Sequence, residues 1–303
     1  MKNINWVNTL FLLGTHILGI IGIFYLLNGF LFDASAGTTH TKTLALGIIM
    51  YIFCGLSMTA GYHRLYSHKA YRCGKFVELF FLAFGSASVQ NSILKWSCDH
   101  RFHHEYVDTD KDPYNIKKGF WWAHIGWIFY ESKNPDFDDQ RFADLMKNPL
   151  VRFQHQYYTL LAVLFGGLLP MAFGALWGDP IGGLLVGGFT RLMIQYHCVF
   201  SINSFTHTFG KQPYTVKNSS RDSWWVALIT FGEGYHNYHH RFPRDWRNGI
   251  HWWQFDQSKW VIWILKIIGL ARGLVSIPKE KIYAARMAVI QQLDGEISAQ
   301  NSS

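Results

Sequence analysis

The residues best suited to chemistry in this sequence are histidines that fall in three short stretches. Spacings of three and four positions put the histidines of HRFHH, and those of HNYHH, along one side of a helix, where their imidazoles converge on a point beside it. Two such helices that face each other form a cage of ring nitrogens. The stretches HRLYSH, HRFHH and HNYHH contain His63 and His68, then His100, His103 and His104, and then His236, His239 and His240.

The first stretch has a different spacing from the other two. His63 and His68 are five positions apart, which separates them by about 140° on an ideal helix at about 100° a residue. We therefore expect the apolar segment before His63 to end near that residue, and the chain to turn before His68.

The number of histidines indicates the kind of metal site. Imidazole is a ligand for Zn, Cu, Fe and Ni, and a structural zinc site is satisfied by four ligands. Eight or more histidines therefore predict two metal ions. An all-imidazole cage leaves the metal charge unneutralised, so carboxylates should orient or balance the ligands, and those well placed are Asp99, Glu105, Asp108, Asp110 and Glu233. A supporting role is also expected of His124 and His197, whereas ordinary core or surface positions are expected for His16, His40, His155 and His251.

The composition indicates a membrane protein. Of 303 residues, 49% are hydrophobic and 16% charged, and the apolar residues are clustered into segments that reach the roughly 20 residues a membrane-crossing helix needs. We predict an all-α integral membrane protein, a single domain over 1–303, in which a cytoplasmic helical cap holds the site for two metals. The four predicted transmembrane helices are about 6–32, 43–62, 157–177 and 181–202, the cap is about 63–156 and 203–284, and a polar tail covers 285–303.

The charge distribution orients this arrangement. The net charge is +8, and Lys and Arg gather in cytoplasmic loops of membrane proteins. The links within the first and second pairs of spans are nearly free of Lys and Arg, so they belong outside, and both termini and the histidine site belong in the cytoplasm. No basic run alternates with exposed aromatic residues on a soluble module, so nucleic acid is not an expected partner.

The apolar segment 76–94 tests this scheme, because HRLYSH precedes it and HRFHH follows it. If it crossed the membrane once, the two histidine groups would lie on opposite faces and could not share a site. It should therefore lie in the interface or re-enter, and its polar half SASVQNS fits a segment that faces protein or a cavity. The segments KKGFWWAHIGWIFY and KWVIWILKIIGLARGL mix basic and Trp-rich faces, as interfacial helices do.

The histidine stretches and their flanks resemble the membrane fatty acyl desaturases, and within them the delta-9, stearoyl-CoA desaturase-like group of bacterial type. The resemblance runs from about residue 44 to 275 and is carried by GYHRLYSHKAY, QNSILKWSCDHRFHHEYVDTDKDPYN, GFWWAHIGW, NSFTH and GEGYHNYHHRFPRDWRNG. It implies an oxidoreductase of fatty acid biosynthesis with two Fe ions and O2 as co-substrate. Such an enzyme introduces a cis double bond, at delta-9, into a saturated acyl chain carried on CoA or on a lipid.

The resemblance also implies roles for residues. Nine histidines hold the irons in the family, and the ninth is matched by His207 in NSFTH. Asn203 of the same stretch matches an asparagine that holds a metal through water. Positions that line or close the acyl tunnel are matched by Gln90, Asn91 and Trp96, and we expect Asp99 to bind substrate with them. Catalysis is expected from no residue beyond the metal ligands.

Two residues depart from the family pattern. Cys98 stands where animal acyl-CoA enzymes have an arginine that contacts the substrate headgroup, so a phospholipid-linked acyl chain becomes an alternative to acyl-CoA. Val199 replaces a threonine at the bend of their tunnel, which leaves the exact bend open.

Electrons must come from another protein, because the sequence has no heme-binding HPGG stretch, no CxxC pair and no dinucleotide-binding Gly-rich turn. The basic cytoplasmic face would attract an acidic carrier, a ferredoxin or cytochrome b5, which is served by its own reductase. The absence of a fused carrier and the compact length favour a bacterial cytoplasmic membrane.

Three alternative functions compete with desaturation. A di-iron fatty acid hydroxylase or alkane monooxygenase has similar histidine stretches because its oxidant is similar. A non-catalytic membrane metal or heme transporter would need ligands within or across the bilayer, whereas these stretches are predicted on one side. A zinc hydrolase is disfavoured by the excess of histidine and by the lack of a general base within a zinc motif.

Overall fold

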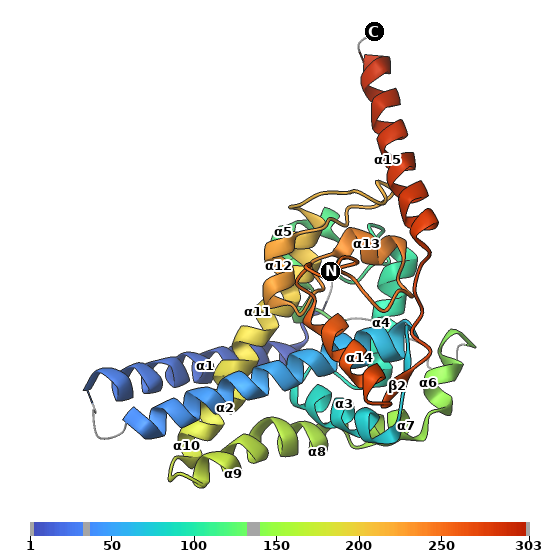
Figure 1. Ribbon diagram of the computed structural model, residues 1–303. Helices are drawn as coiled ribbons and strands as arrows, with labels where there is room; N and C mark the ends of the chain where they lie inside the picture. The colour runs from blue at the N-terminus through green and yellow to red at the C-terminus, as the bar shows by residue number, and fades with distance from the viewer. Residues whose placement is uncertain (1–2, 33–36, 132–139, 301–303) are drawn as a thin grey trace.

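The computed structural model describes residues 3–32, 37–131 and 140–300, which are mostly helical (Figure 1). The longer helices are α1 (Trp6–Phe32), α2 (Gly37–Leu56), α3 (Lys75–Ala87), α4 (Ile93–Tyr106), α11 (Arg191–Ser204), α14 (Gln257–Ile267) and α15 (Lys279–Gln300). The shorter ones are α5 (Phe120–His124), α6 (Ala143–Lys147), α7 (Pro149–Gln156), α8 (Tyr158–Val163), α9 (Leu169–Ala175), α10 (Pro180–Gly182), α12 (Trp224–Ile229) and α13 (His236–Arg241). The two strands β1 (Arg72–Cys73) and β2 (Ala271–Arg272) pair antiparallel.

Helical turns of other types interrupt or extend these helices. The wider π type occurs in η2 (Ser57–Ser67), η6 (Leu164–Leu168) and η7 (Gly183–Thr190). The tighter 3-10 type occurs in η3 (Ile116–Lys118), η4 (Gly126–Phe129), η5 (Gln140–Phe142) and η8 (Phe205–His207).

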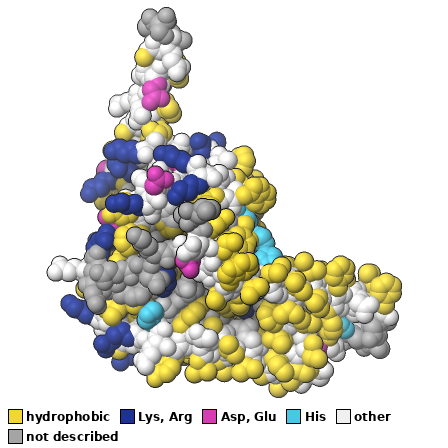
Figure 2. Space-filling view, turned by 180° about the vertical axis from the view of Figure 1, so that it is seen from behind, with side chains coloured by type: hydrophobic (Ala, Val, Ile, Leu, Met, Phe, Trp, Pro, Cys, Tyr) yellow, Lys and Arg dark blue, Asp and Glu magenta, His cyan; other side chains and the backbone are white. Residues whose placement is uncertain are grey.

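An apolar arm of helices extends from one side of a wider body, and both figures show it (Figures 1 and 2). Within the described residues, three helical runs are long and apolar enough to cross a membrane, namely Trp6–Phe32, Gly37–Ser67 and Tyr158–Ala175. Their outer faces expose large apolar side chains, such as Leu31, which is 69% exposed, and Leu160, which is 64% exposed. Such surfaces are unfavourable in water and fit a lipid surround, so this is a helical protein of the membrane.

A fourth helical run, from Pro180 through η7 to Ser204, lies against the first two runs in the arm. Glycines allow the close approach: a Cβ on Gly22 would lie 3.0 Å from the carbonyl oxygen of Leu185, and one on Gly47 would lie 3.0 Å from Val186 Cγ1. This run is not among the three that meet the length and hydropathy requirement. Its second half, RLMIQYHCVFSINS, is much more polar and includes the buried Arg191.

The second helix does not end near His63, so that prediction is wrong. The chain continues as the π-helix η2 to Ser67, and the N–H of His68 donates to the carbonyl oxygen of His63 at 3.1 Å. A π-helix bonds residue i to residue i+5, which brings side chains five positions apart to the same side. The wider turn, rather than an early helix end, therefore makes the HRLYSH spacing compatible with one site.

The helix η2 is the centre of the body. Its residues pack on one side with α4, through Met58, Tyr62 and Ile93, and on another with α3 and α14, through Ala60 and Ile262. A Cβ on Gly61 would lie 2.8 Å from the Phe81 ring, so only glycine permits this closeness to α3. Helix α3 has 13 residues and measures about 20 Å, which is too short to cross the roughly 30 Å hydrocarbon core.

The segment 285–303, predicted as a polar tail, is helical as far as Gln300, and its last three residues lie outside the described part of the chain. Helix α15 projects from the body as a single helix (Figure 1), and only Ile282, Ala285 and Val289 of it are buried. Its first half is therefore held by the body.

Candidate metal centre

The structure brings the nine histidines that the sequence singled out into two groups. In each group the potential ligand atoms lie within 4.8 Å of one another. They come from four separate segments of the chain, namely η2 with the residue that follows it, α4, η8 and α13. The first group is His63, His68, His100, His104 and His239, and the second is His103, His207, His236 and His240.

The distances between ring nitrogens fit shared metal ions. Nε2 of His239 lies 3.0 Å from that of His63 and 2.9 Å from that of His104. Nε2 of His236 lies 3.1 Å from that of His207 and 3.0 Å from that of His240. Metal–imidazole bonds of about 2.0–2.1 Å put neighbouring ligand nitrogens about 3 Å apart. A single ring nitrogen has either one proton or one lone pair, so convergence of several nitrogens is better explained by a cation between them than by hydrogen bonds.

A buried nitrogen without a partner supports the same interpretation. Nε2 of His103 is buried and has no hydrogen-bond partner, although its side chain belongs to the second group. Buried polar atoms almost always have a hydrogen-bond partner, and a buried atom without one needs an explanation such as a bound ion. The residues present therefore fit two metal ions, each held mainly by imidazole.

The environment keeps the ligands in the form that binds metals. Burial, followed by the charges of neighbouring histidines, lowers the pKa of His100 and His104 in the first group and of His236 and His240 in the second. The pKa of His207 is lowered to about 3, mainly by burial. Neutral imidazole is the metal-binding form, so the site is electrostatically prepared for cations.

Glu233 supports the first group as the sequence predicted. Its Oε2 lies 2.8 Å from Nδ1 of His63, its Oε1 lies 2.9 Å from the Arg64 guanidinium, and it accepts a 2.6 Å hydrogen bond from Asn248. Burial raises the pKa of Glu233, but the interactions of its carboxylate with His63 and Arg64 outweigh burial, so the pKa is held below its usual value. The ionised carboxylate fixes the His63 ring with Nε2 turned toward the metal position.

The second group has two carboxylate supports. Nδ1 of His103 is 3.0 Å from the buried carboxylate of Asp112. Nδ1 of His207 is 2.7 Å from the Ser219 hydroxyl, which in turn is 2.5 Å from Asp108. Asp108 therefore acts on its ligand through one intervening hydroxyl.

A cavity of about 660 Å³ begins at both histidine groups and extends into the apolar arm. His63 and His100 of the first group and His103 and His236 of the second contribute to its wall. Most of the remaining lining is apolar and comes from α1, from the helical run 158–175 and from the run 180–204. The volume lies within the range of about 300–1,000 Å³ that is usual for small-molecule sites.

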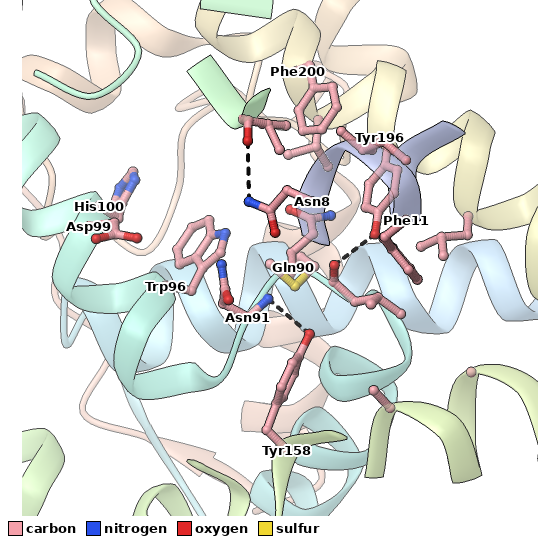
Figure 3. Close-up of a pocket in the computed structure, with 18 of the residues that line it drawn as sticks. Asn8, Phe11, Gln90, Asn91, Trp96, Asp99, His100, Tyr158, Tyr196 and Phe200 are labelled. Atoms are coloured by element: carbon pink, nitrogen blue, oxygen red, sulfur yellow. Dashed lines mark hydrogen bonds between the residues drawn. The ribbon is translucent and has the colours of Figure 1, made fainter. Parts of the chain in front are cut away.

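The part of the wall next to the histidine groups is built by one face of α4 and the loop before it (Figure 3). Trp96 stacks on the His100 ring, with centroids 5.0 Å apart and an interplanar angle of 14°. The N–H of Asn91 donates to the Tyr158 hydroxyl at 2.9 Å, and Asn91 has a φ of +73°. The buried amide nitrogen of Gln90 has no hydrogen-bond partner, which leaves it available to a molecule in the cavity.

The comparisons with known proteins agree with this site. Residues 41–263 match the family model described as fatty acid desaturase. A probable acyl-CoA desaturase of Schizosaccharomyces pombe is 41% identical over 96% of this chain and 58% of its own length. An sn-1 stearoyl-lipid 9-desaturase of Anabaena variabilis is 37% identical over 89% of this chain and 94% of its own length. A stearoyl-CoA desaturase 5 of Bos taurus is 34% identical over 80% of this chain and 74% of its own length.

The chain belongs to the fatty acid desaturase family. This confirms the family that the histidine stretches and their flanks predicted. The chain spans less than three fifths of the length of the two fungal relatives, at 58% and 56%, and nearly the whole length of the cyanobacterial one.

Two of the expected carboxylate supports, Glu105 and Asp110, do not contact either histidine group. The Glu105 carboxylate pairs with Arg141 at 2.7 Å and is 44% exposed. The face of α4 that lines the cavity contains Trp96, Asp99, His100 and His103. Because a helix turns by about 100° at each residue, Glu105 lies on the opposite face. Asp110 lies in the loop after α4, its side chain is 99% exposed, and its nearest cation is Lys118 at 3.8 Å.

Two other residues, Asp99 and Cys98, have surroundings that differ from those expected. Asp99 lines the cavity but pairs with Lys95 at 2.7 Å rather than with a histidine. Cys98 is fully buried in the core beside Met58 and is not part of the cavity wall. Val199 does line the cavity, as does Asn203.

The remaining histidines stay outside both groups. His16, His197 and His124 form a chain of ring contacts of 3.0 and 3.1 Å that ends on the Ser204 hydroxyl, so His124 and His197 do not support metal ligands directly. Among the residues expected to be structural, Nδ1 of His155 contacts the Ser92 hydroxyl at 2.7 Å, His40 packs on Tyr25, and His251 stacks on Trp253.

Sequence reasoning missed Asp112 and Ser219. The acidic residues at 108, 110 and 112 alternate along one loop, and the pattern alone did not separate them. A signal was nevertheless present: DPYN begins at Asp112, and aspartate before proline is typical of a turn whose side chain bonds nearby backbone. Asp112 indeed accepts from the N–H groups of Asp108 and Tyr114.

Proposed function

We propose that this protein is an oxygen-dependent fatty acyl desaturase that introduces a cis double bond, at delta-9, into a saturated acyl chain. One observation carries the proposal: a mostly apolar cavity starts at two groups of histidines and runs into the apolar arm. An acyl chain in such a cavity would have its methylenes against the metals. The relatives named as 9-desaturases support the position of the bond.

Two Fe ions are the proposed cofactors. The first would be held by His63, His68, His100, His104 and His239, and the second by His103, His207, His236 and His240 with Asn203 acting through water. When bound, iron with an open position supplies the activation of O2. The overall reaction takes two hydrogens from neighbouring carbons, together with one O2, two electrons and two protons, and gives the alkene and two waters.

The protein would contribute position and exclusion of water. A saturated chain has no polar group near the reacting carbons, so the shape of the cavity must decide which carbons meet the metals. Trp96 is held in place by stacking on His100 and would fix the path of the chain beside the metals. The free amide of Gln90 and the pocket-facing Asn91 would bind ordered water in the part of the cavity beside the histidine groups.

The acyl carrier is proposed as CoA or a lipid. Relatives of both kinds match, because a probable acyl-CoA desaturase and an sn-1 stearoyl-lipid 9-desaturase are of similar identity. The predicted headgroup position, Cys98, is buried in the core, so it offers no contact that would favour CoA.

We further propose four membrane spans, the fourth being the run 180–204, with a cytoplasmic cap and both termini on the cytoplasmic side of a bacterial membrane. The close contacts of this run with Gly22 of α1 and Gly47 of α2 support a fourth membrane span, because small residues allow helices to pack closely in membranes. Arg191 is compatible with a position inside the membrane, because its guanidinium donates to the Ala87 carbonyl at 2.9 Å and to Gln195 at 3.1 Å. Charged residues within membrane spans are paired in this way with protein groups. The electron donor would be a ferredoxin or cytochrome b5 with its reductase.

The proposal is tested by expression in a host that lacks unsaturated fatty acids. We expect cis double bonds at delta-9, and separate analysis of the acyl-CoA and phospholipid pools during a short pulse identifies the carrier. The His104→Ala variant should give none. Hydroxylated products without alkenes would instead assign the chain to the related di-iron hydroxylases, and full activity of the His104→Ala variant would contradict the metal site.

A further inference from the structure

A second hollow, of about 720 Å³, is lined by the end of η2 and the residues that follow it. Tyr66 and Lys69 contribute to its wall, and the two-stranded sheet and the loop after α13 contribute arginines. We call it the basic groove. It is lined among others by Lys69, Arg72, Arg244, Arg272, Glu78 and Asp144.

The cations of the basic groove are only partly balanced. Glu78 accepts hydrogen bonds from Tyr66 and Asn148, and Asp144 pairs with Arg101 at 2.8 Å and Lys69 at 3.1 Å. Within the described part of the chain, the guanidinium groups of the three arginines have no hydrogen bond or ion pair: Arg72, Arg244 and Arg272.

The arrangement of two of these arginines is itself unfavourable. Arg72 of β1 is directly opposite Arg272 of β2 in the antiparallel pair, and like charges in such cross-strand positions repel each other. Both side chains line the same groove. An anionic partner from outside would remove this repulsion, so the groove is suited to bind negative charge.

The groove is directly connected to the first histidine group. Lys69 follows the ligand His68 in the chain, and Tyr66 lies between His63 and His68. Arg101, which follows the ligand His100, donates to the carbonyl oxygens of Tyr66 and Ser67 and pairs with Asp144 of the groove. The segment that joins His63 to His68 therefore forms part of the wall of the groove. Arg101 ties α4, which contains His100, to the same segment.

The basic groove lies on a side of the molecule that a soluble partner can reach. Strand β2 and helix α6 lie at the end of the molecule remote from the turn between α9 and α10 at the tip of the arm (Figure 1). Lys and Arg side chains gather over the wide body, whereas the arm is covered by hydrophobic residues (Figure 2). A partner that reaches the groove would approach from water.

We infer that the basic groove is the docking surface for an acidic one-electron carrier protein. The inference rests on the proposed function, since desaturation consumes two electrons that a carrier must deliver. Two reduced carriers would bind in turn, each would be oxidised by one electron, and docking in the groove would put the redox group of the carrier against the segment between His63 and His68. Charge complementarity would make association fast and sensitive to salt.

The test measures binding directly on the full-length, iron-loaded protein in lipid nanodiscs. The probes are an acidic plant-type [2Fe–2S] ferredoxin and the soluble haem domain of cytochrome b5. The triple variant Arg72→Gln, Arg244→Gln, Arg272→Gln is compared with a control of equal net charge, Arg152→Gln, Lys211→Gln, Arg286→Gln, whose three residues are exposed and lie outside the groove. Iron content and the unfolding temperature establish that both variants are folded.

We expect the groove variant to associate with a carrier about tenfold more slowly at low ionic strength, and the difference to shrink at high salt. The control should stay within about twofold of the parent protein. Equal loss in both variants, unchanged binding in the groove variant, or no binding of either carrier to the parent would overturn the inference. So would loss of inorganic phosphate binding with unchanged carrier binding, because the groove would then be a small-anion site. Double-bond formation by the parent with dithionite as reductant tests the proposed function separately.

Discussion

Nδ1 of His63 lies 2.8 Å from Oε2 of Glu233, although the two residues come from opposite halves of the chain. The contact joins η2 to the loop before α13, so one carboxylate fixes the His63 ring and ties η2 to the segment that leads to His239 of the same group. Arg64, the residue after His63, is held by the same carboxylate and by Asp256 at 2.9 Å. The metal site and the fold of the body therefore share one buried network.

Loss of the Glu233 charge should weaken metal binding at the first group. Removal of a carboxylate that orients a histidine ligand typically lowers metal affinity by about 10–100-fold, so we expect Glu233→Gln to lose one of two irons under mild chelation. Iron content measured after dialysis against graded chelator concentrations checks this. The matched control is Glu105→Gln, because Glu105 is paired with Arg141 on the opposite face of α4. Equal iron retention in the two variants would contradict a role for Glu233.

Asp112 should orient a histidine of the second group, His103, as Glu233 orients His63 in the first group. Burial raises the pKa of Asp112, but the charge and hydrogen bond of His103 outweigh it, so the pKa is lowered and the carboxylate is ionised. Asp112→Asn is expected to lower iron affinity at the second group by about 10–100-fold, with desaturation reduced in parallel. Asp110→Asn is the control, since that side chain is almost fully exposed. If the two variants retain iron equally, Asp112 has only a structural role in its loop.

The clustering of eight of the nine histidines could be expected from residue type and spacing in the three histidine stretches, whereas His207 was expected only from the family resemblance. HxxHH places its rings on one face whatever the surrounding fold does. The distribution between the two groups could not be expected, because His103 and His104 are neighbours in α4 and yet belong to different groups. That division depends on where α13 and η8 approach α4, which only tertiary packing decides.

The π-helix shows a second limit of sequence reasoning. An ideal helix puts His63 and His68 on different sides, and the early helix end expected for that reason does not occur. Whether a backbone bonds i to i+4 or to i+5 depends on small differences in packing, here the close contact of Gly61 with Phe81, and no residue pattern encodes it strongly. Three of the four predicted apolar spans correspond to the helical runs Trp6–Phe32, Gly37–Ser67 and Tyr158–Ala175, because a long apolar segment is recognised from composition rather than from exact geometry.

Metal removal should destabilise the body without unfolding the helices. A ligand that binds only the folded state adds about 4 kcal/mol when present at 1,000 times its Kd, so two irons held this way make a large contribution. We expect chelator-treated protein to keep its helical circular dichroism but to unfold at a clearly lower temperature, and iron to restore the original value. The hydrophobic clusters around η2 contain none of the proposed metal ligands and therefore explain the retained helices. An unchanged unfolding temperature would mean that the two histidine groups hold no tightly bound ion.

The depth of the cavity should set the preferred length of the acyl chain. Gly167 lines the cavity, and a Cβ there would meet only Leu184 Cδ1, at 3.8 Å. Gly167→Leu should therefore fill part of the cavity rather than disturb the helix packing. Each methylene left without a place loses about 0.8 kcal/mol of burial, so the ratio of kcat/KM for a 16-carbon chain over an 18-carbon chain should rise on the order of tenfold. Product analysis with mixed acyl chains measures this ratio.

Gly14→Leu provides the matched control for that experiment. Gly14 lies on α1 with no atom within 4 Å of an added Cβ, and it does not line the cavity. The added side chain should therefore face lipid and leave chain-length preference unchanged. A shift of similar size in both variants would indicate a general effect of the substitutions on the arm, and an unchanged ratio in Gly167→Leu would mean that the acyl chain does not extend to this part of the cavity.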